Sequence, residues 1–328
     1  MSLKMAFKLS CWSCLILCMA AYYCGQKVFD VTQYGAMADS KTDNIQWAFS
    51  NAWKAACEFN GPTSLAIPQG IFFVGPVIFR GPCYNNISNA KIANLTFLDS
   101  KGFHMSIQRS SNVTIRNLNI STTENSHNTD GIHISGSNNI DLATLTIGTG
   151  DDCISISQGN TNVSISNVAC GPGHSISIGS LRKYMNEKNV AGVNVRNCTV
   201  SSTSNGIRIK TWHGAPPSEA SDITFEGIIT ENVSNTIIID QKYSRGITAV
   251  MRGTSNKVVA VNFMCSQLVP CENVTLHDIN LEFVSSSGSS SITSSLIQNN
   301  SSLVQNITSS CLNVKGMALG IQKPATCL

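Results

Sequence analysis

The chain has 328 residues, of which 12% are charged, and a formal net charge of +3 at pH 7. This length allows one substantial core or at most two domains. So small a charge creates no general basic field, which excludes nucleic acid as an expected partner. The abundance of Asn, Ser, Thr, Ile and Val favours stacked strands over helices.

Residues 1–24 have the pattern of a secretory signal peptide, because Lys4 and Lys8 precede an apolar run, Cys11–Ala21, that has small residues near its end. A membrane anchor is the rival interpretation, but the run is short for a span. We therefore expect a secreted protein that has no membrane partner after cleavage. Residues 25–328 are expected to form a single domain.

Export also explains the cysteines. Of thirteen, four lie in the N-terminal segment, and the nine that remain leave at least one free thiol or intermolecular partner. We expect most of them to form disulfides, as in other secreted proteins. Among these nine, no Cys-x-x-Cys pair accompanies histidines, so we expect no metal and no cofactor.

One segment, Asp43–Phe59, has a helical pattern, with Asp43 as its expected N-cap. Its apolar residues are Ile45, Trp47, Ala48, Ala52, Ala55 and Ala56. Such a helix is suited to closing the open end of a stack of strands.

From Ile87 to about Phe283 the sequence alternates strands and turns, as in NVTIRNLNI, NIDLATLTI and NVSISNVAC. Asn at the turns tolerates a left-handed backbone and can stack its amide along successive coils. These features predict an all-β chain, a right-handed parallel β-helix, with the short helix as an N-terminal cap. Ser285–Ser302 is serine-rich and is expected to be a mobile loop, and Cys311–Cys327 is expected to form a C-terminal cap.

Three polar residues occupy the same phase of this repeat. Aligned on the Ile-x-Ile cores that follow them, Asp130, Asp152 and His174 are separated by steps of 22 residues. Such a step is one coil of a parallel solenoid, where equivalent residues stack about 4.8 Å apart. Asp151 adds a third acid, and the NGIRIK segment brings Arg208 and Lys210 to the same cleft. The sequence therefore predicts a glycosidase site on one solvent-facing stripe.

A lone Asp at a strand entry is more often a turn residue that bonds nearby backbone. Three carboxylates within the rise of one coil are a different case from a lone Asp. Their mutual repulsion is expected to hold one of them protonated near neutral pH, as a general acid beside ionised bases requires. His174 is expected directly over Asp152. Strict alternation puts Asp151 and Asp152 on opposite faces, so both reach the cleft only if a corner of the coil lies there. Arg208 and Lys210 leave one face of their strand and predict a bound carboxylate.

These segments resemble four signatures of the plant polygalacturonases of glycoside hydrolase family 28. The signatures are NTD, DD, a GHG-type motif and RIK, and their counterparts here are Asn128-Thr129-Asp130, Asp151-Asp152, Gly173-His174-Ser175 and Arg208-Ile209-Lys210. The stretches CGPGHSISIGSL and SLRKYMNEKNV are also similar, the latter to the pollen exopolygalacturonase branch. The resemblance covers nearly the whole of residues 25–328.

The resemblance implies a secreted cell-wall enzyme that hydrolyses α-1,4-linked galacturonic acid in pectin with inversion, more exo- than endo-acting, and we expect a monomer. By this likeness Asp151 is the general acid and His174 supports it. Asp130 and Asp152 activate the attacking water. The implied substrate-binding residues are Asn128, Arg208, Lys210 and Tyr243. An inverting enzyme needs its acid and base about 6.5–9.5 Å apart, which adjacent coils can supply diagonally.

Three departures favour an alternative, a weak or inactive member that only binds pectin, or a misfolded product. The family has Gly at the position of Ser175, which is expected to crowd the substrate or displace His174. Roughly two to three coils of the solenoid are missing after Cys83. After Tyr243 the family's cysteine is replaced by Ser244.

Two other enzymes are less consistent with the sequence. A rhamnogalacturonan hydrolase is a poorer match for Arg208 and Lys210, which suit a uronate, and a pectate lyase needs a set of calcium-binding carboxylates.

The coils also predict the disulfides. Cys153–Cys170 would join adjacent coils directly after the acids, Cys265–Cys271 would close a short loop, and Cys311–Cys327 would close the C-terminal cap. Cys57–Cys83 is the fourth expected pair, which leaves Cys198 free.

Overall fold

The computed structural model describes most of the chain, in the ranges 27–39, 41–42, 45–80, 83, 90–212, 218–240, 245–268, 270–285 and 306–328. The predicted signal peptide, Asp43, Tyr243 and all but the first residue of Ser285–Ser302 lie outside them. The chain divides into two compact units, residues 1–88 and 89–328. The single-domain organisation with a helical cap stays a prediction.

The first unit contains the helix that the sequence predicts. Its elements are β1 (Lys27–Asp30), the 3-10 helix η1 (Val31–Tyr34), α2 (Ile45–Glu58) and β2 (Thr63–Ala66), and β1 and β2 pair in parallel. Ala48, Ala52 and Ala56 recur every four residues and form the buried face of α2. The expected apolar residue Trp47 is instead 58% exposed. It lies one residue, about 100° of helix, away from that face.

Among the residues that the structure describes, no helix has the length and apolar character needed to cross a membrane.

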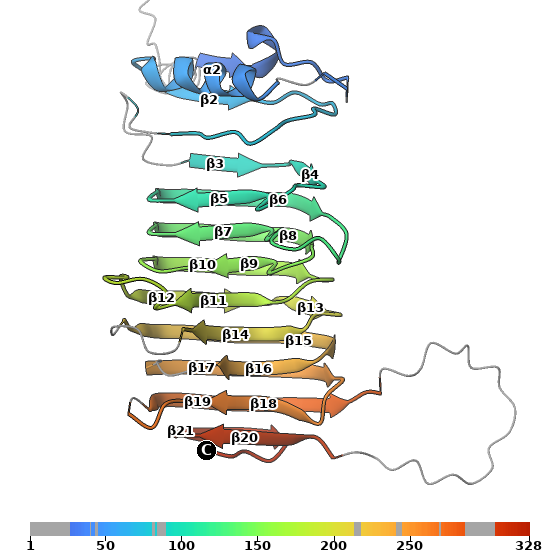
Figure 1. Cartoon of the computed structure of the whole chain (residues 1–328), viewed down its shortest axis with the longest axis vertical. Coiled ribbons are helices and arrows are strands. Elements are labelled where there is room, and N and C mark those ends of the chain that lie inside the picture. Colours follow the sequence, from blue (N-terminus) through green and yellow to red (C-terminus); the bar gives the residue numbers. More distant parts are fainter. Residues whose placement is uncertain are drawn as a thin grey trace, which may run out of the picture. The chain divides into compact units, whose positions relative to one another are not determined.

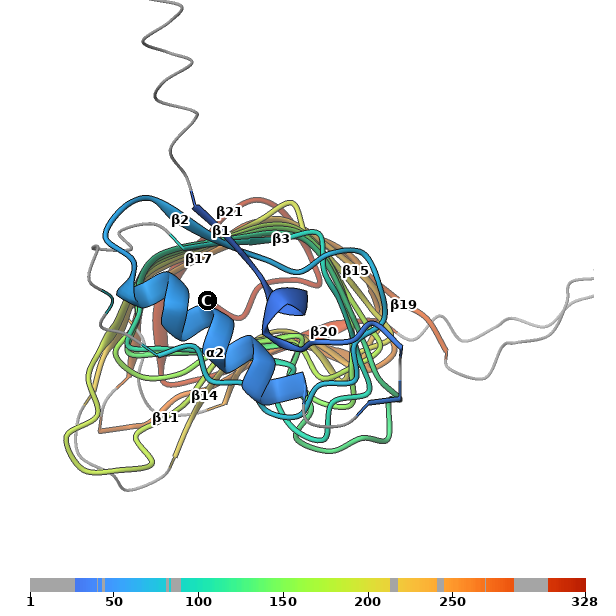
Figure 2. The same cartoon turned by 90° about the horizontal axis from the view of Figure 1, so that it is seen from above.

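The second unit is a right-handed parallel β-helix, as the sequence predicts. Figure 1 shows its strands stacked coil on coil, and Figure 2 shows the coils around a common interior. One strand of each coil joins an 8-stranded parallel sheet, made of β5 (Met105–Gln108), β7 (Ile132–Ser135), β9 (Ile154–Ile156), β11 (Ile176–Leu181), β14 (Asn205–Thr211), β16 (Asn235–Asp240), β18 (Val259–Met264) and β20 (Thr308–Leu312).

The remaining strands of the second unit form an 11-stranded parallel sheet. Its members are β3 (Ala90–Ala93), β4 (Thr96–Leu98), β6 (Ser111–Ser121), β8 (Asn138–Gly148), β10 (Thr161–Cys170), β12 (Val190–Arg196), β13 (Thr199–Ser201), β15 (Ala220–Val233), β17 (Arg245–Ser255), β19 (Cys271–Phe283) and β21 (Val314–Lys323). The chain passes from one sheet to the other at each turn, so every coil has two main sides.

Columns of inward-facing isoleucines set the register of these coils. Parallel pairing places Ile132, Ile154, Ile176 and Ile207 in one row, and each is at most 2% exposed. The 22-residue step is therefore confirmed. Full burial of one such side chain is worth about 1.5–3 kcal/mol, and a slip of one residue would turn the whole column outward.

Asparagines occupy the turns as expected. Asn112, Asn139 and Asn162 all have positive φ, between 53° and 55°. Nδ2 of Asn139 donates to Oδ1 of Asn112 at 3.0 Å, and Nδ2 of Asn162 donates to Oδ1 of Asn139 at 3.1 Å. Asparagine suits this position because it tolerates the left-handed backbone and carries both a donor and an acceptor.

All four predicted disulfides are present, namely Cys57–Cys83, Cys153–Cys170, Cys265–Cys271 and Cys311–Cys327. Cys198 is buried and free, also as predicted. The bond between Cys153 and Cys170 joins the segment directly after Asp151 and Asp152 to the end of β10.

Cys198 should resist alkylation in the native protein. Burial raises the pKa of its thiol to about 11, and only the thiolate reacts. We expect iodoacetamide at pH 8, without reductant, to leave Cys198 unmodified until guanidinium chloride unfolds the chain. Mass spectrometry of the peptides measures this. Rapid native labelling of Cys198 would contradict its burial, and labelling of Cys153 or Cys170 in the unfolded chain would contradict the pairing.

Candidate active site

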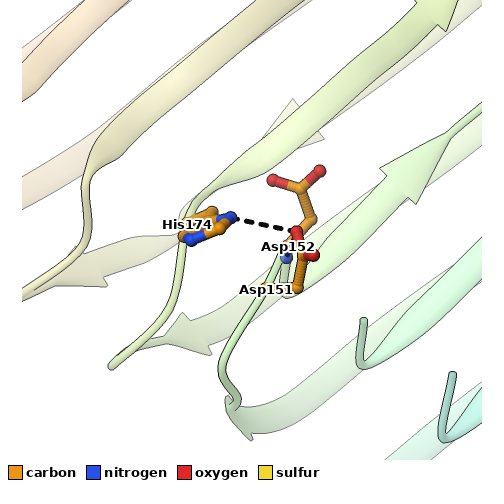
Figure 3. A group of neighbouring side chains, drawn as sticks. All are labelled: Asp151, Asp152 and His174. Carbon is orange, nitrogen blue, oxygen red and sulfur yellow. Dashed lines mark hydrogen bonds and ion pairs between the residues drawn. The ribbon is translucent and has the colours of Figure 1, made fainter. Parts of the chain in front are cut away.

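The three acids lie at turns that lead into the 8-stranded sheet. Asp130 is two residues before β7, Asp152 is two residues before β9, and the two strands pair in register. Asp151 belongs to the same turn as Asp152, and His174 is two residues before β11. A corner of the coil therefore lies where the sequence required one, and Asp151 and His174 meet there (Figure 3).

His174 bonds Asp151, the contact that the resemblance implies, and its ring also lies close to Asp152, as its phase predicts. Nδ1 of His174 lies 3.0 Å from Oδ1 of Asp151. The backbone N–H of His174 also donates to the Asp151 carbonyl at 2.8 Å, which holds the histidine against that residue. The side-chain hydrogen bond lowers the pKa of Asp151 and raises the pKa of His174. The two side chains therefore form an ion pair whenever His174 is protonated.

Backbone donors fix the rest of the Asp151 carboxylate. Its Oδ2 accepts the N–H of Asn128 at 3.2 Å, and its Oδ1 accepts the N–H of Asp152 at 2.8 Å. Asn128 thus contacts the site through its backbone, and its side chain is exposed. Tyr243, the other expected contact outside the acid cluster, lies outside the described residues.

Asp130 is the acid that holds a proton most readily. Desolvation by burial is the largest cause, the charges of Asp151 and Asp152 add to it, and the pKa of Asp130 is raised to about 6. Oγ of Ser155 donates to Oδ2 of Asp130 at 2.5 Å and opposes the rise. The repulsion that the sequence predicts contributes to the raised pKa, and removal from water contributes more.

Asp152 is only 1% exposed, and three donors satisfy it. The hydroxyls of Ser175 and Ser177 each donate to Oδ1 at 2.8 Å. Nζ of Lys210 lies 2.8 Å from Oδ2. A buried carboxylate without partners is costly, so these donors are what allow Asp152 to remain inside the coil.

These contacts bear on the expected roles of three residues. Ser175 is fully buried, so it does not crowd a substrate in the cleft, and His174 stays bonded to Asp151 beside it. Lys210 pairs with Asp152 through one of its three donors, and its binding of a substrate carboxylate stays a prediction. Arg208 is half-buried and has no ion pair with an acid within the described ranges.

Sequence reasoning missed His133, Ser155 and Ser177. Each is the middle residue of an Ile-x-Ile core, and register continues their row to Arg208. Nδ1 of His133 lies 2.8 Å from Oγ of Ser155, and the Phe103 ring stacks on the imidazole with centroids 4.6 Å apart. The signal was available, because the middle residue of such a core must face outward.

Ligand atoms of Asp151, Asp152 and His174 lie within 4.8 Å of one another, close enough to hold a metal ion. The ammonium of Lys210 already pairs with Asp152, and His174 pairs with Asp151. The carboxylates thus have cationic partners within the protein. That no metal or cofactor takes part stays a prediction.

Comparison with known proteins adds four similarities. The family model described as Glycosyl hydrolases family 28 matches residues 82–311. Exopolygalacturonase clone GBGE184 of Arabidopsis thaliana is 36% identical and covers 82% of either chain. The exopolygalacturonase of Platanus acerifolia is 32% identical, over 83% of this chain and 94% of its own. A hyperthermoactive exopolygalacturonase from Thermotoga maritima has a similar fold, with a TM-score of 0.63 at 15% identity, over 78% of this chain and 87% of its own.

Asp130→Asn should stabilise the fold near neutral pH. The pKa of Asp130 is about 6 in the folded protein and about 4 in an unfolded chain, so the native state loses stability as pH rises from about 4 through 6. At pH 7.5 we expect urea unfolding to give a free energy about 1–3 kcal/mol higher for the variant than for the parent. Near pH 4 the difference should vanish.

The matched control is Asp141→Asn, which changes a more exposed acid paired with Arg116 on the other sheet. It should not produce this pH dependence. An Asp130→Asn variant no more stable than the parent at pH 7.5 would contradict the raised pKa.

Proposed function

Because the chain belongs to glycosyl hydrolase family 28, we propose that it hydrolyses the α-1,4-galacturonosyl linkages of polygalacturonate, the backbone of pectin, from a chain end. The names of its relatives support the substrate and the exo mode. The observation that carries the proposal is the meeting of Asp130, Asp151, Asp152 and His174 at successive turns. Arg208 lies beside them, next to Ser177 in register.

Asp151 is the proposed general acid. In the free protein the proton of the pair resides on His174, since their hydrogen bond lowers the pKa of Asp151 and raises the pKa of His174. A bound uronate brings negative charge and excludes water, and both effects favour a protonated carboxyl. The proton then moves from His174 to Asp151 and on to the glycosidic oxygen as the bond breaks.

Asp130 is the proposed base for the attacking water, with Asp152 beside it. A pKa of about 6 makes Asp130 a stronger proton acceptor than an ordinary carboxylate, yet leaves it ionised above that pH. Water attacks the face of the sugar opposite the leaving group, so the configuration inverts. Donors from Ser175, Ser177 and Lys210 hold the Asp152 carboxylate in position beside this base.

Arg208 is proposed to bind the uronate carboxylate, because it lies beside Ser177 in register and forms no ion pair among the described residues. Lys210 acts through its ion pair with Asp152. Asn128 and Tyr243 are proposed as further substrate contacts by resemblance alone. Export to the cell wall, removal of residues 1–24 and action as a monomer are also part of this proposal.

A catalytically weak protein that binds pectin is the second candidate, and Ser175 is the observation in its favour. The hydroxyls of Ser175 and Ser177 both donate to Oδ1 of Asp152. A carboxylate oxygen accepts about two hydrogen bonds in its plane, so this oxygen has no position left for a catalytic water.

Asp151→Asn should abolish hydrolysis of polygalacturonate while leaving the fold intact, because the change is isosteric at a half-buried position. General acid–base catalysis is worth about 10²–10⁴-fold, and we expect kcat to fall by that factor. Analysis of released sugars by size measures activity and exo mode together, since an exo enzyme releases monomer from the start.

Asp141→Asn is the control and should keep the parent activity. Parent protein that releases no sugar would overturn the hydrolase proposal in favour of the binding protein. An Asp151→Asn variant within a few-fold of an active parent would remove Asp151 from its role.

Ser175→Ala and Ser175→Gly should have the same effect on turnover. Both remove the hydroxyl from Oδ1 of Asp152 and free one acceptor position for water. One hydrogen bond is worth about 0.5–1.5 kcal/mol, so we expect kcat to rise up to about tenfold with little change in KM. A rise with glycine alone would show that the Cβ matters instead. If kcat rose in neither variant, Ser175 would have no inhibitory role.

A further inference from the structure

Three exposed residues form a cluster of one cation and two aromatic rings beyond the ends of β11 and β14. Tyr184 is 65% exposed and Trp212 is 51% exposed. Nζ of Lys183 lies 5.3 Å from the centroid of the Tyr184 ring and 5.7 Å from that of Trp212. The ammonium is thus held between two aromatic surfaces that face solvent.

The turn that carries Lys183 and Tyr184 is fixed by a carboxylate. Oε1 of Glu187 accepts the backbone N–H groups of both residues at 2.9 Å. Trp212 is anchored independently, because its backbone N–H donates to the Leu181 carbonyl at 2.8 Å, one step beyond the end of β14. Hydrogen bonds therefore fix the backbone of both segments that carry the cluster.

This turn is an enlargement of one coil. The step from Ile176 to Ile207 is 31 residues, against 22 from Ile154 to Ile176. The connection 182–189 between β11 and β12 contributes to the extra length, since the corresponding connection one coil earlier is only 157–160.

The cluster continues the face that carries the site. Strand alternation puts Arg208 and Lys210 on one face of β14, and Trp212 is the next residue of that series. Two residues of strand span about 6.6 Å. Because Nζ of Lys210 contacts Asp152, the series of residues that leads to Trp212 starts at the acids.

A purely structural role for Lys183 does not account for the exposure of its neighbours. Cation–π contact satisfies the ammonium in part, but Lys183 has no ion pair in the part of the chain that the structure describes. Two exposed rings beside an unpaired ammonium match a sugar acid, which offers an apolar ring face and a carboxylate.

We propose that Lys183, Tyr184 and Trp212 form a subsite for a uronate residue of the polysaccharide away from the bond that is cleaved. Lys183 pairs with its carboxylate, and the ring of Trp212 or Tyr184 packs on the sugar. This inference rests on the proposed function, since it assumes a galacturonate chain at the acids.

The test is calorimetric binding of oligogalacturonates in the Asp151→Asn background, where the ligand is not cleaved. Lys183→Ala and Trp212→Ala should each weaken hexagalacturonate binding by about tenfold or more, and digalacturonate binding by less than about twofold. Trp212→Phe keeps a ring and should retain most of the affinity. Lys188→Ala is the matched control, because it removes an exposed lysine from the same turn outside the cluster.

Equal losses for both lengths, no loss for either, or an equal loss in Lys188→Ala would each overturn the subsite. If the parent hydrolyses polygalacturonate while the cluster variants bind normally, the subsite alone is rejected. If the parent neither cleaves nor binds any oligogalacturonate, the proposed function fails, and the subsite fails with it.

Discussion

The packing of isoleucines in parallel register is the constraint on which the rest of this structure depends. Ile132, Ile154 and Ile176 occupy one inward row, and their burial fixes which residue of each coil lies beside which residue of the next. Residues far apart in sequence then meet at the turns. The register of the coils, and not the sequence around each residue, brings them together. The packing of the isoleucine column therefore brings the acids together.

The same register supplies the donors that hold a buried charge. Asp152 precedes β9, Ser175 and Ser177 come from the next coil, and Lys210 comes from the coil after that. Loss of one coil from this stack would leave Asp152 inside the protein without its partners, at a cost of several kcal/mol. The site therefore tolerates missing coils elsewhere in the solenoid better than it tolerates a change between β7 and β14.

The sequence was sufficient to predict features that depend on the length of the repeat and on the position of a residue along the chain. The 22-residue step predicted the coils, and the positions of the cysteines along the chain predicted the four disulfides. It was insufficient where a turn decides the direction of a side chain. His174 shares the phase of Asp152, yet its side chain bonds Asp151, because it lies in the turn before β11. Ser175 lies on the same face as Ser177, and both hydroxyls reach Asp152 of the neighbouring coil. The prediction for Trp47 was wrong for a similar reason. Its position on the helix, and not its apolar character, decides how exposed it is.

Three aspartates of one site differ in surroundings, and that difference separates what each can do. Asp151 is half-exposed beside a histidine, Asp130 is buried with one hydroxyl donor, and Asp152 is buried with two hydroxyls and an ammonium. A group that must exchange protons needs access to the substrate, which the half-buried Asp151 has and the buried Asp152 lacks. Lys210 pairs with the third acid, whereas Arg208 lies beside the acids in register and has no ion pair among the described residues.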